Sequence, residues 1–308
     1  MIKRFMPAVL ISPALLISLA SFMILGCADK KSGSAEAAVE EKVIAASFYP
    51  MYIAALNITE NVPGIRVVNM APTAAGCMHD YQMTAADAML IEKAEVLIIN
   101  GAGLDTFLDK AATSNKNLTV INASGWIPGG DCVNDVHIDP HVWMSVNLHI
   151  RQITHIAEKL AEWDTVNAHA YADNAQRYAD RLTALATDAY GGQSELSTAV
   201  NRNIVISHSG FVYLTNQFYL KVTAVVERGS GAEPGAADIV RAVNTIKQEK
   251  VKAIFVEKGH HSPASKTIST ETGVPIFELN MIVSGPDEKD AYINAMKKNV
   301  LTLTEALR

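Results

Sequence analysis

The chain has 308 residues, of which 49% are hydrophobic and 19% charged, and its formal net charge is -6 at pH 7. This length is sufficient for two domains with hydrophobic cores of their own. The negative charge and the lack of a basic patch argue against a nucleic acid as partner.

The first 27 residues have the layout of a secretory signal peptide. Lys3 and Arg4 precede an apolar segment, residues 5–26, that ends at Cys27. A retained membrane anchor is the alternative, since about 20 apolar residues can cross a bilayer. Two prolines within the segment favour processing. In both cases we expect the folded part to lie outside the cytoplasm.

The end of this segment, residues 24–27, reads Ile-Leu-Gly-Cys and resembles the bacterial lipoprotein processing box. The resemblance implies that Cys27 is lipidated and anchors the mature protein to the outer face of the cell membrane. Residues 28–42 are small or charged and contain no aromatic side chain, so they predict a flexible tether.

The rest of the chain predicts an α/β fold of two lobes, residues 43–165 and 192–308. In each lobe, strand and helix patterns alternate, which favours a small parallel sheet flanked by helices. The expected strands lie at residues 43–47, 66–70, 96–100, 118–122, 204–207, 223–227, 253–257 and 275–279. The expected helices lie at residues 52–60, 84–93, 106–112, 211–218, 236–249, 263–272 and 291–306.

A long helix is predicted to join the lobes, over residues 166–191. No glycine or proline occurs between His141 and Tyr190, and these are the residues most costly inside a helix. Apolar residues follow helical spacing in the second half of this segment. They are Tyr171, Ala175, Tyr178, Leu182, Leu185 and Ala189.

Several potential metal ligands follow the predicted strands. Parallel sheets bind ligands beyond the carboxyl ends of their strands, and imidazole suits zinc and related metals. Scattered loop histidines are the alternative interpretation. The candidates are His79, His141, His208, Glu257 and Asn280.

Four motifs surround the candidate ligands. They read Gly-Cys-Met-His-Asp-Tyr-Gln-Met-Thr at residues 76–84, Asp-Pro-His-Val-Trp at 139–143, Ile-Ser-His-Ser-Gly-Phe at 206–211 and Glu-Pro-Gly at 233–235. They resemble the zinc/manganese solute-binding lipoproteins of bacterial ABC transporters. The resemblance covers nearly the whole mature chain, and it implies that His79, His141 and His208 are metal ligands. It also implies capture of a divalent metal ion outside the cell and delivery to a membrane permease; we expect a monomer.

The fourth metal ligand is open, because Asn280 stands where the family usually has an aspartate. Glu257 is the nearest carboxylate, and a bound water is a further possibility. His260 and His261 are either auxiliary ligands or part of a solvated turn. Zn²⁺ is the first choice of metal because the site is rich in imidazole, and Mn²⁺ is the alternative.

Two cysteines, Cys77 and Cys132, remain if Cys27 is lipidated. In an oxidising compartment they predict a disulfide, with a Cys77 thiolate ligand as the alternative. A secreted zinc hydrolase that uses Glu257 as general base is a rival function, although no His-Glu-x-x-His motif is present. A surface adhesin is a third possibility.

Overall fold

The computed structural model describes residues 41–71, 81–128, 132–133, 136–190, 196, 198–227, 234–260 and 262–308. All of them belong to one compact unit, Val39–Arg308. The predicted signal peptide, residues 1–27, and the tether as far as residue 40 lie outside these residues. Of the helices in the described ranges, none has the length and apolar character needed to cross a membrane.

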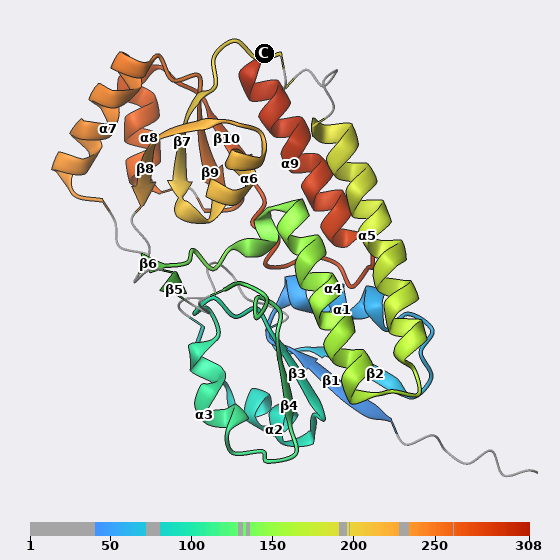
Figure 1. The fold of residues 1–308 in the computed structure, drawn as a ribbon. Coiled ribbons are helices and arrows are strands. Elements are labelled where there is room, and N and C mark those ends of the chain that lie inside the picture. The colour runs from blue at the N-terminus through green and yellow to red at the C-terminus, as the bar shows by residue number, and fades with distance from the viewer. Residues whose placement is uncertain are drawn as a thin grey trace, which may run out of the picture. The chain divides into compact units, whose positions relative to one another are not determined.

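The first sheet has four parallel strands in the order β2-β1-β3-β4 (Figure 1). The central strands are the most apolar ones, because a strand covered on both faces needs a continuous hydrophobic sequence. The bounds agree closely with those predicted. They are β1 (Lys42–Ala46), β2 (Ile65–Asn69), β3 (Val96–Ile99) and β4 (Thr119–Asn122).

Three helices accompany this sheet, α1 (Tyr49–Ile58), α2 (Ala85–Lys93) and α3 (Asp109–Ala112). A capping box begins α2, because the side chains of Thr84 and Asp87 accept hydrogen bonds from each other's backbone N–H groups. A short antiparallel pair, β5 (Cys132–Val133) and β6 (Val136–His137), was not predicted. Two-residue strands are too short to produce a periodic pattern.

The second sheet is also fully parallel, with the order β10-β9-β7-β8. The predicted α/β class with two small parallel sheets is thereby confirmed. The strands are β7 (Asn203–His208), β8 (Lys221–Glu227), β9 (Ala253–Glu257) and β10 (Ile276–Leu279). The helices are α6 (Val212–Gln217), α7 (Ala236–Glu249), α8 (Pro263–Thr272) and α9 (Ala291–Leu307).

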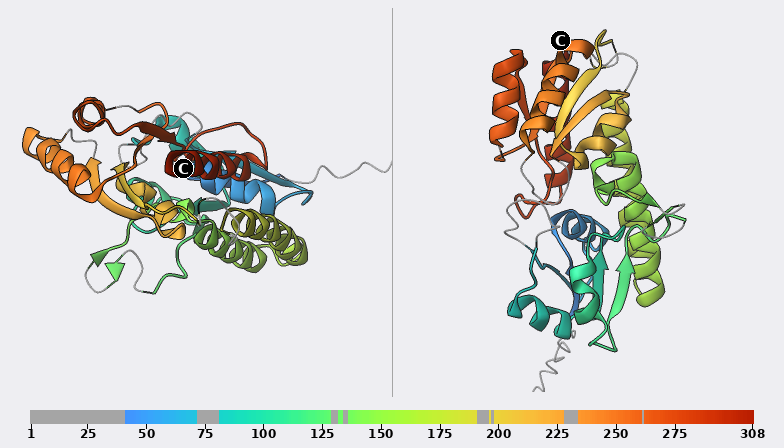
Figure 2. Two further views of the ribbon diagram at one scale, coloured as in Figure 1. Left: turned by 90° about the horizontal axis from the view of Figure 1, so that it is seen from above. Right: turned by 90° about the vertical axis from the view of Figure 1, so that its left-hand side faces the viewer.

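The segment without glycine or proline forms two long helices, α4 (Val146–Trp163) and α5 (Ala168–Tyr190). They pack side by side, as both views in Figure 2 show. The chain turns at Asp164, whose carboxylate accepts hydrogen bonds from Asn167 and Tyr171. All six apolar residues predicted to share one face of α5 are buried.

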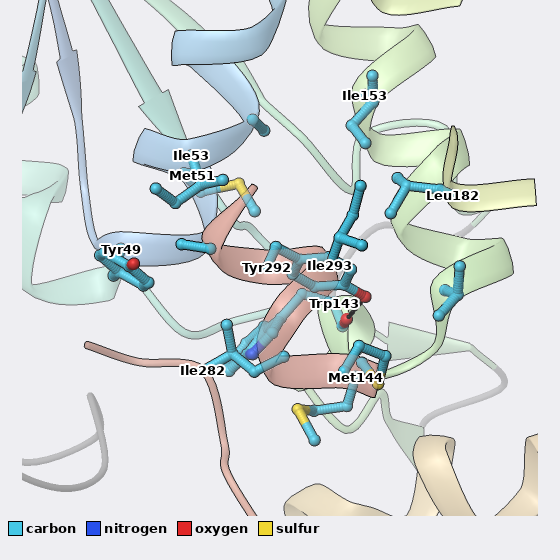
Figure 3. Packing of buried hydrophobic residues seen from close by; sticks show 14 of the residues in the cluster. Tyr49, Met51, Ile53, Trp143, Met144, Ile153, Leu182, Ile282, Tyr292 and Ile293 are labelled. Atoms are coloured by element: carbon cyan, nitrogen blue, oxygen red, sulfur yellow. Dashed lines mark hydrogen bonds between the residues drawn. The ribbon is translucent and has the colours of Figure 1, made fainter. Parts of the chain in front are cut away.

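One continuous core connects the two sheets. Its residues come from β1 and β3 as well as from β7 and β9, and it includes parts of α1, α4, α5 and α9. Figure 3 shows Trp143 and Met144 packed beside Tyr292, Ile293 and Ile282. The segment that follows His141 is therefore buried at the junction of the two halves.

Candidate metal centre

His141 lies at the start of a buried 3₁₀ helix, Val142–Met144, and only 2% of its side chain is exposed. The indole N–H of Trp143 donates to the carbonyl of Met281 at 2.8 Å. The hydroxyl of Tyr292 donates to the carbonyl of Trp143 at 2.7 Å. The backbone beside His141 is thus fixed by groups from the second half of the chain.

Two further bonds hold the residues just before His141. The Tyr213 hydroxyl donates to the carbonyl of Asp139, and the Asn100 amide donates to the carbonyl of Pro140, both at 2.9 Å. Asn100 follows β3 of the first sheet, whereas Tyr213 belongs to α6 beside the second sheet. Both halves therefore determine where the imidazole of His141 lies.

His208 ends β7 and lies beside His141. The two ring centroids are 5.0 Å apart, with the rings nearly perpendicular at 80°. Nδ1 of His208 accepts the backbone N–H of Gly210 at 2.9 Å. Gly210 is required here, since a Cβ would lie 2.4 Å from Cε of Met281 and 2.8 Å from Cδ2 of His141.

A carboxylate orients the His141 ring. Oδ1 of Asp139 lies 2.7 Å from Nδ1 of His141. Burial alone would raise the pKa of Asp139, but the hydrogen bonds and charge of His141 outweigh it, so this pKa is lowered. Metal-binding histidines commonly have one ring nitrogen bonded to a carboxylate in this way, and Nε2 is then the ligating atom.

The remaining two described candidates lie at the carboxyl edge of the second sheet. Glu257 ends β9; burial raises its pKa, the charge of Glu227 raises it further, and His260 and His141 act in the opposite direction. The side-chain oxygen of Asn280 accepts the backbone N–H of Ile282 at 2.7 Å. Glu257, His260 and Asn280 line one cavity of about 730 Å³.

Other predicted site residues lie outside the described residues: Cys27, Cys77, His79 and His261. Cys132 is the one cysteine in the described ranges, so they contain no cysteine pair, and the predicted disulfide receives no support. Within the described ranges, no three His, Cys, Asp or Glu side chains gather closely enough to hold a metal ion. The structure brings His141 and His208 together and leaves the rest of the ligand set untested.

Sequence reasoning missed the buried position of His149 on α4. It is fully buried, its ring stacks on Tyr292 with centroids 4.3 Å apart, and Nδ1 lies 3.1 Å from Oε1 of Gln152. The Gln152 amide in turn donates to Oδ1 of Asn100 at 3.0 Å. Helical spacing with the buried residues Val146 and Ile153 was the available signal.

Glu227 was also missed as a candidate. It ends β8, and its Cα is the register partner of His208 on the neighbouring strand. The signal lay in strand order, because only the pairing of β7 with β8 brings residues 208 and 227 side by side. A single sequence does not contain that order.

Comparison with known proteins agrees with these features. A family model described as zinc-uptake complex component A, periplasmic, matches residues 44–306. The SBP FpvC of Pseudomonas aeruginosa, solved in complex with Mn²⁺, is 31% identical, covers 87% of this chain and 98% of its own, and has a TM-score of 0.76. A crystal structure of ZnuA, 23% identical with a TM-score of 0.75, shares the fold.

Relatives among the curated proteins are named for zinc binding or zinc uptake. The zinc-binding lipoprotein AdcA of Streptococcus pneumoniae is 26% identical over 94% of this chain, but the match spans only 60% of AdcA. The zinc uptake protein ZnuA of Bacillus subtilis is 24% identical over 95% of this chain and 97% of its own length. These are solute-binding proteins and not enzymes, so the hydrolase alternative is not favoured. The chain belongs to the zinc-uptake complex component A family.

Proposed function

We propose that this protein captures a divalent transition metal ion outside the cytoplasm and delivers it to an ABC permease. The observation that carries the proposal is the pair His141 and His208. Their imidazoles come from different halves of the chain, yet their centroids are 5.0 Å apart at the junction. Two neighbouring imidazoles, one of them oriented by a carboxylate, are typical of a transition-metal site.

The proposed ligand set is His79, His141 and His208, with Glu257 or Asn280 in the fourth position. Each of these residues follows a predicted strand, except Glu257, which ends one. Glu257 is the preferred fourth ligand because it is charged, whereas the side-chain oxygen of Asn280 already accepts a hydrogen bond from Ile282. An amide oxygen would also leave the double positive charge of the ion uncompensated.

Zinc is the preferred metal and manganese the alternative. Imidazole donors favour zinc in the usual order of divalent affinities, while carboxylate donors suit manganese. The names of the relatives divide in the same way: some are called zinc-binding, and MntA of Halalkalibacterium halodurans, 26% identical over 94% of this chain, is called manganese-binding.

The proposed location is the outer face of the cell membrane, with lipidated Cys27 as the anchor. Relatives named as lipoproteins support this proposal. The part of the predicted tether that precedes β1, residues 28–41, would allow the folded unit to reach the permease. Within that unit we propose lobes at residues 43–165 and 192–308, joined through residues 166–191, so that metal is bound between the lobes.

Native mass spectrometry and calorimetric titration test this function. The mature protein, purified with chelator, is titrated with Zn²⁺ or Mn²⁺, and one bound ion per chain is expected. His141→Ala and His208→Ala should each weaken binding by about 10-fold or more. His169→Ala, at an exposed position of α5, is the matched control and should bind like the parent. Parent-like binding by both site variants would rule out this site.

A further inference from the structure

The carboxyl edge of the second sheet holds a row in which an imidazole, that of His208, lies between two glutamates. Glu227 is the register partner of His208 on one side of β7. On the other side Ile206 pairs with Phe255, and this register continued by two residues puts His208 level with Glu257. Residues two apart on a strand share a face, so His208 and Glu257 lie on the face of Ile206 and Phe255, which belong to the main core. Val226 belongs to the smaller core on the opposite face, so its neighbour Glu227 lies on the same face as His208.

Glu227 is half-buried at this edge. Its Oε1 atom is buried and has no hydrogen-bond partner among the residues that the structure describes. A buried carboxylate oxygen without a donor costs free energy unless a cation or a donor compensates it. This observation is independent of the position of Glu227 in the row, and it points to a positively charged occupant.

The two glutamates lie on either side of His208 in this row. Neighbouring strands are about 4.8 Å apart, so the two backbones lie about 10 Å apart with His208 between them. A divalent cation bound at His208 would lie between the two carboxylates.

We propose that Glu227 belongs to the metal site and supplies, together with Glu257, the negative charge that balances the bound ion. This inference rests on the proposed function. It explains how the chain accommodates Asn280, since the missing negative charge is provided by another strand of the same sheet. Because carboxylate oxygen is a harder donor than imidazole, Glu227 favours Mn²⁺ over Zn²⁺ and broadens the range of ions that the site accepts.

Three variants test the inference by titration with Zn²⁺ and Mn²⁺ separately. Glu227→Gln keeps the shape of the side chain but removes its charge, and it should weaken Mn²⁺ binding by about 10-fold or more and Zn²⁺ binding less. Glu227→Asp keeps the charge and should retain most of the affinity. Glu249→Gln removes the same charge at the end of α7, where Glu249 pairs with Lys221 at 2.8 Å, and should bind like the parent.

A second measurement separates a charge role from a structural one. Without metal, Glu227→Gln should melt at the same temperature as the parent or higher, because it removes the charge from a carboxylate whose buried Oε1 atom has no hydrogen-bond donor among the described residues. Loss of affinity together with unchanged or increased stability supports the inference. Lowered metal-free stability, or equal losses of affinity in Glu227→Gln and Glu227→Asp, would overturn it.

The outcomes also distinguish this inference from the proposed function. Parent-like binding of both ions by Glu227→Gln would overturn the role of Glu227 and leave the proposed function standing. A parent protein that binds neither ion would overturn both. The loss of metal affinity in Glu227→Gln is assigned to the site only if Glu249→Gln binds both ions like the parent.

Discussion

Asp139 holds His141 through two contacts to a single oxygen. Oδ1 of Asp139 lies 2.7 Å from Nδ1 of the ring and also accepts the backbone N–H of His141 at 3.0 Å. The carboxylate therefore fixes both the orientation and the tautomer of the imidazole, with the proton on Nδ1. A carboxylate in this position also makes the opposite nitrogen a better metal donor.

We therefore expect Asp139→Asn to weaken zinc binding by about 10-fold or more, as is typical when the partner of a ligating histidine is changed. Isothermal titration at pH 7.5 measures the effect. Glu158→Gln is the matched control, because the exposed Glu158 lies 3.8 Å from a half-buried histidine, His155 of α4, outside the site. Equal affinities for Asp139→Asn and the parent would show that the carboxylate is dispensable.

The close contact at Gly210 gives a second prediction. In Gly210→Ala the new methyl group would lie 2.4 Å from Cε of Met281 and 2.8 Å from Cδ2 of His141. Met281 is flexible, but the ring of His141 is bonded to Asp139 and packs against Trp143 and His208, so we expect a loss of about 1–3 kcal/mol in the free energy of unfolding. Zinc affinity should fall as well, because the ring is displaced.

Urea unfolding and metal titration of the same variant measure both effects. The control is Gly235→Ala, where the added methyl group meets only Oδ2 of Asp238, at 3.6 Å. If Gly210→Ala proves as stable as Gly235→Ala and binds zinc normally, the packing of Gly210 against His141 does not position the ring.

The fold was largely predictable from the sequence because its local patterns and its packing agree. The apolar face of α5 was identified from spacing alone, and the central strands β1 and β9 from their continuous apolar sequences. The break between α4 and α5 was not identified. It depends on hydrogen bonds between Asp164 and residues later in the chain, and no glycine or proline marks it.

The site was predictable only in part, for a different physical reason. Strand ends can be located in one sequence, and His141 and His208 were selected by that rule. Which strands pair with each other is decided by long-range packing, so the position of Glu227 beside His208 was not accessible. The buried state of His149 likewise depends on α9, which supplies Tyr292.

The hydroxyl of Tyr292 gives a third prediction. It donates to the carbonyl of Trp143 in the core, and Tyr292→Phe would leave that buried acceptor without this donor. We expect a loss of about 1–2 kcal/mol in the free energy of unfolding, while the stacking on His149 is retained. Tyr219→Phe is the control, since Tyr219 is 85% exposed. Equal stabilities of the two variants in urea would contradict the role of this hydrogen bond.

The last prediction concerns the buried imidazole of His149 and the stability of the metal-free protein. Burial lowers the pKa of His149 from 6.5 to about 4, although its bond to Gln152 acts in the opposite direction. The unfolded chain thus binds a proton near pH 6.5 that the folded chain does not accept until about pH 4. The contribution of His149 to stability is complete above pH 6.5 and is lost as the pH falls toward 4, at about 1.4 kcal/mol per pH unit.

Urea unfolding between pH 7.5 and 4.5 measures this dependence. A chelator keeps the protein free of metal, so that the release of bound metal does not contribute to the change in the free energy of unfolding. Other groups titrate in the same range, so the parent must be compared with His149→Phe, which keeps a ring against Tyr292 but has no proton to bind. We expect the variant to lose less stability than the parent over the range, by about 2 kcal/mol or more. Parallel stability curves for the two proteins would mean that His149 accepts a proton in the folded state as readily as in the unfolded chain.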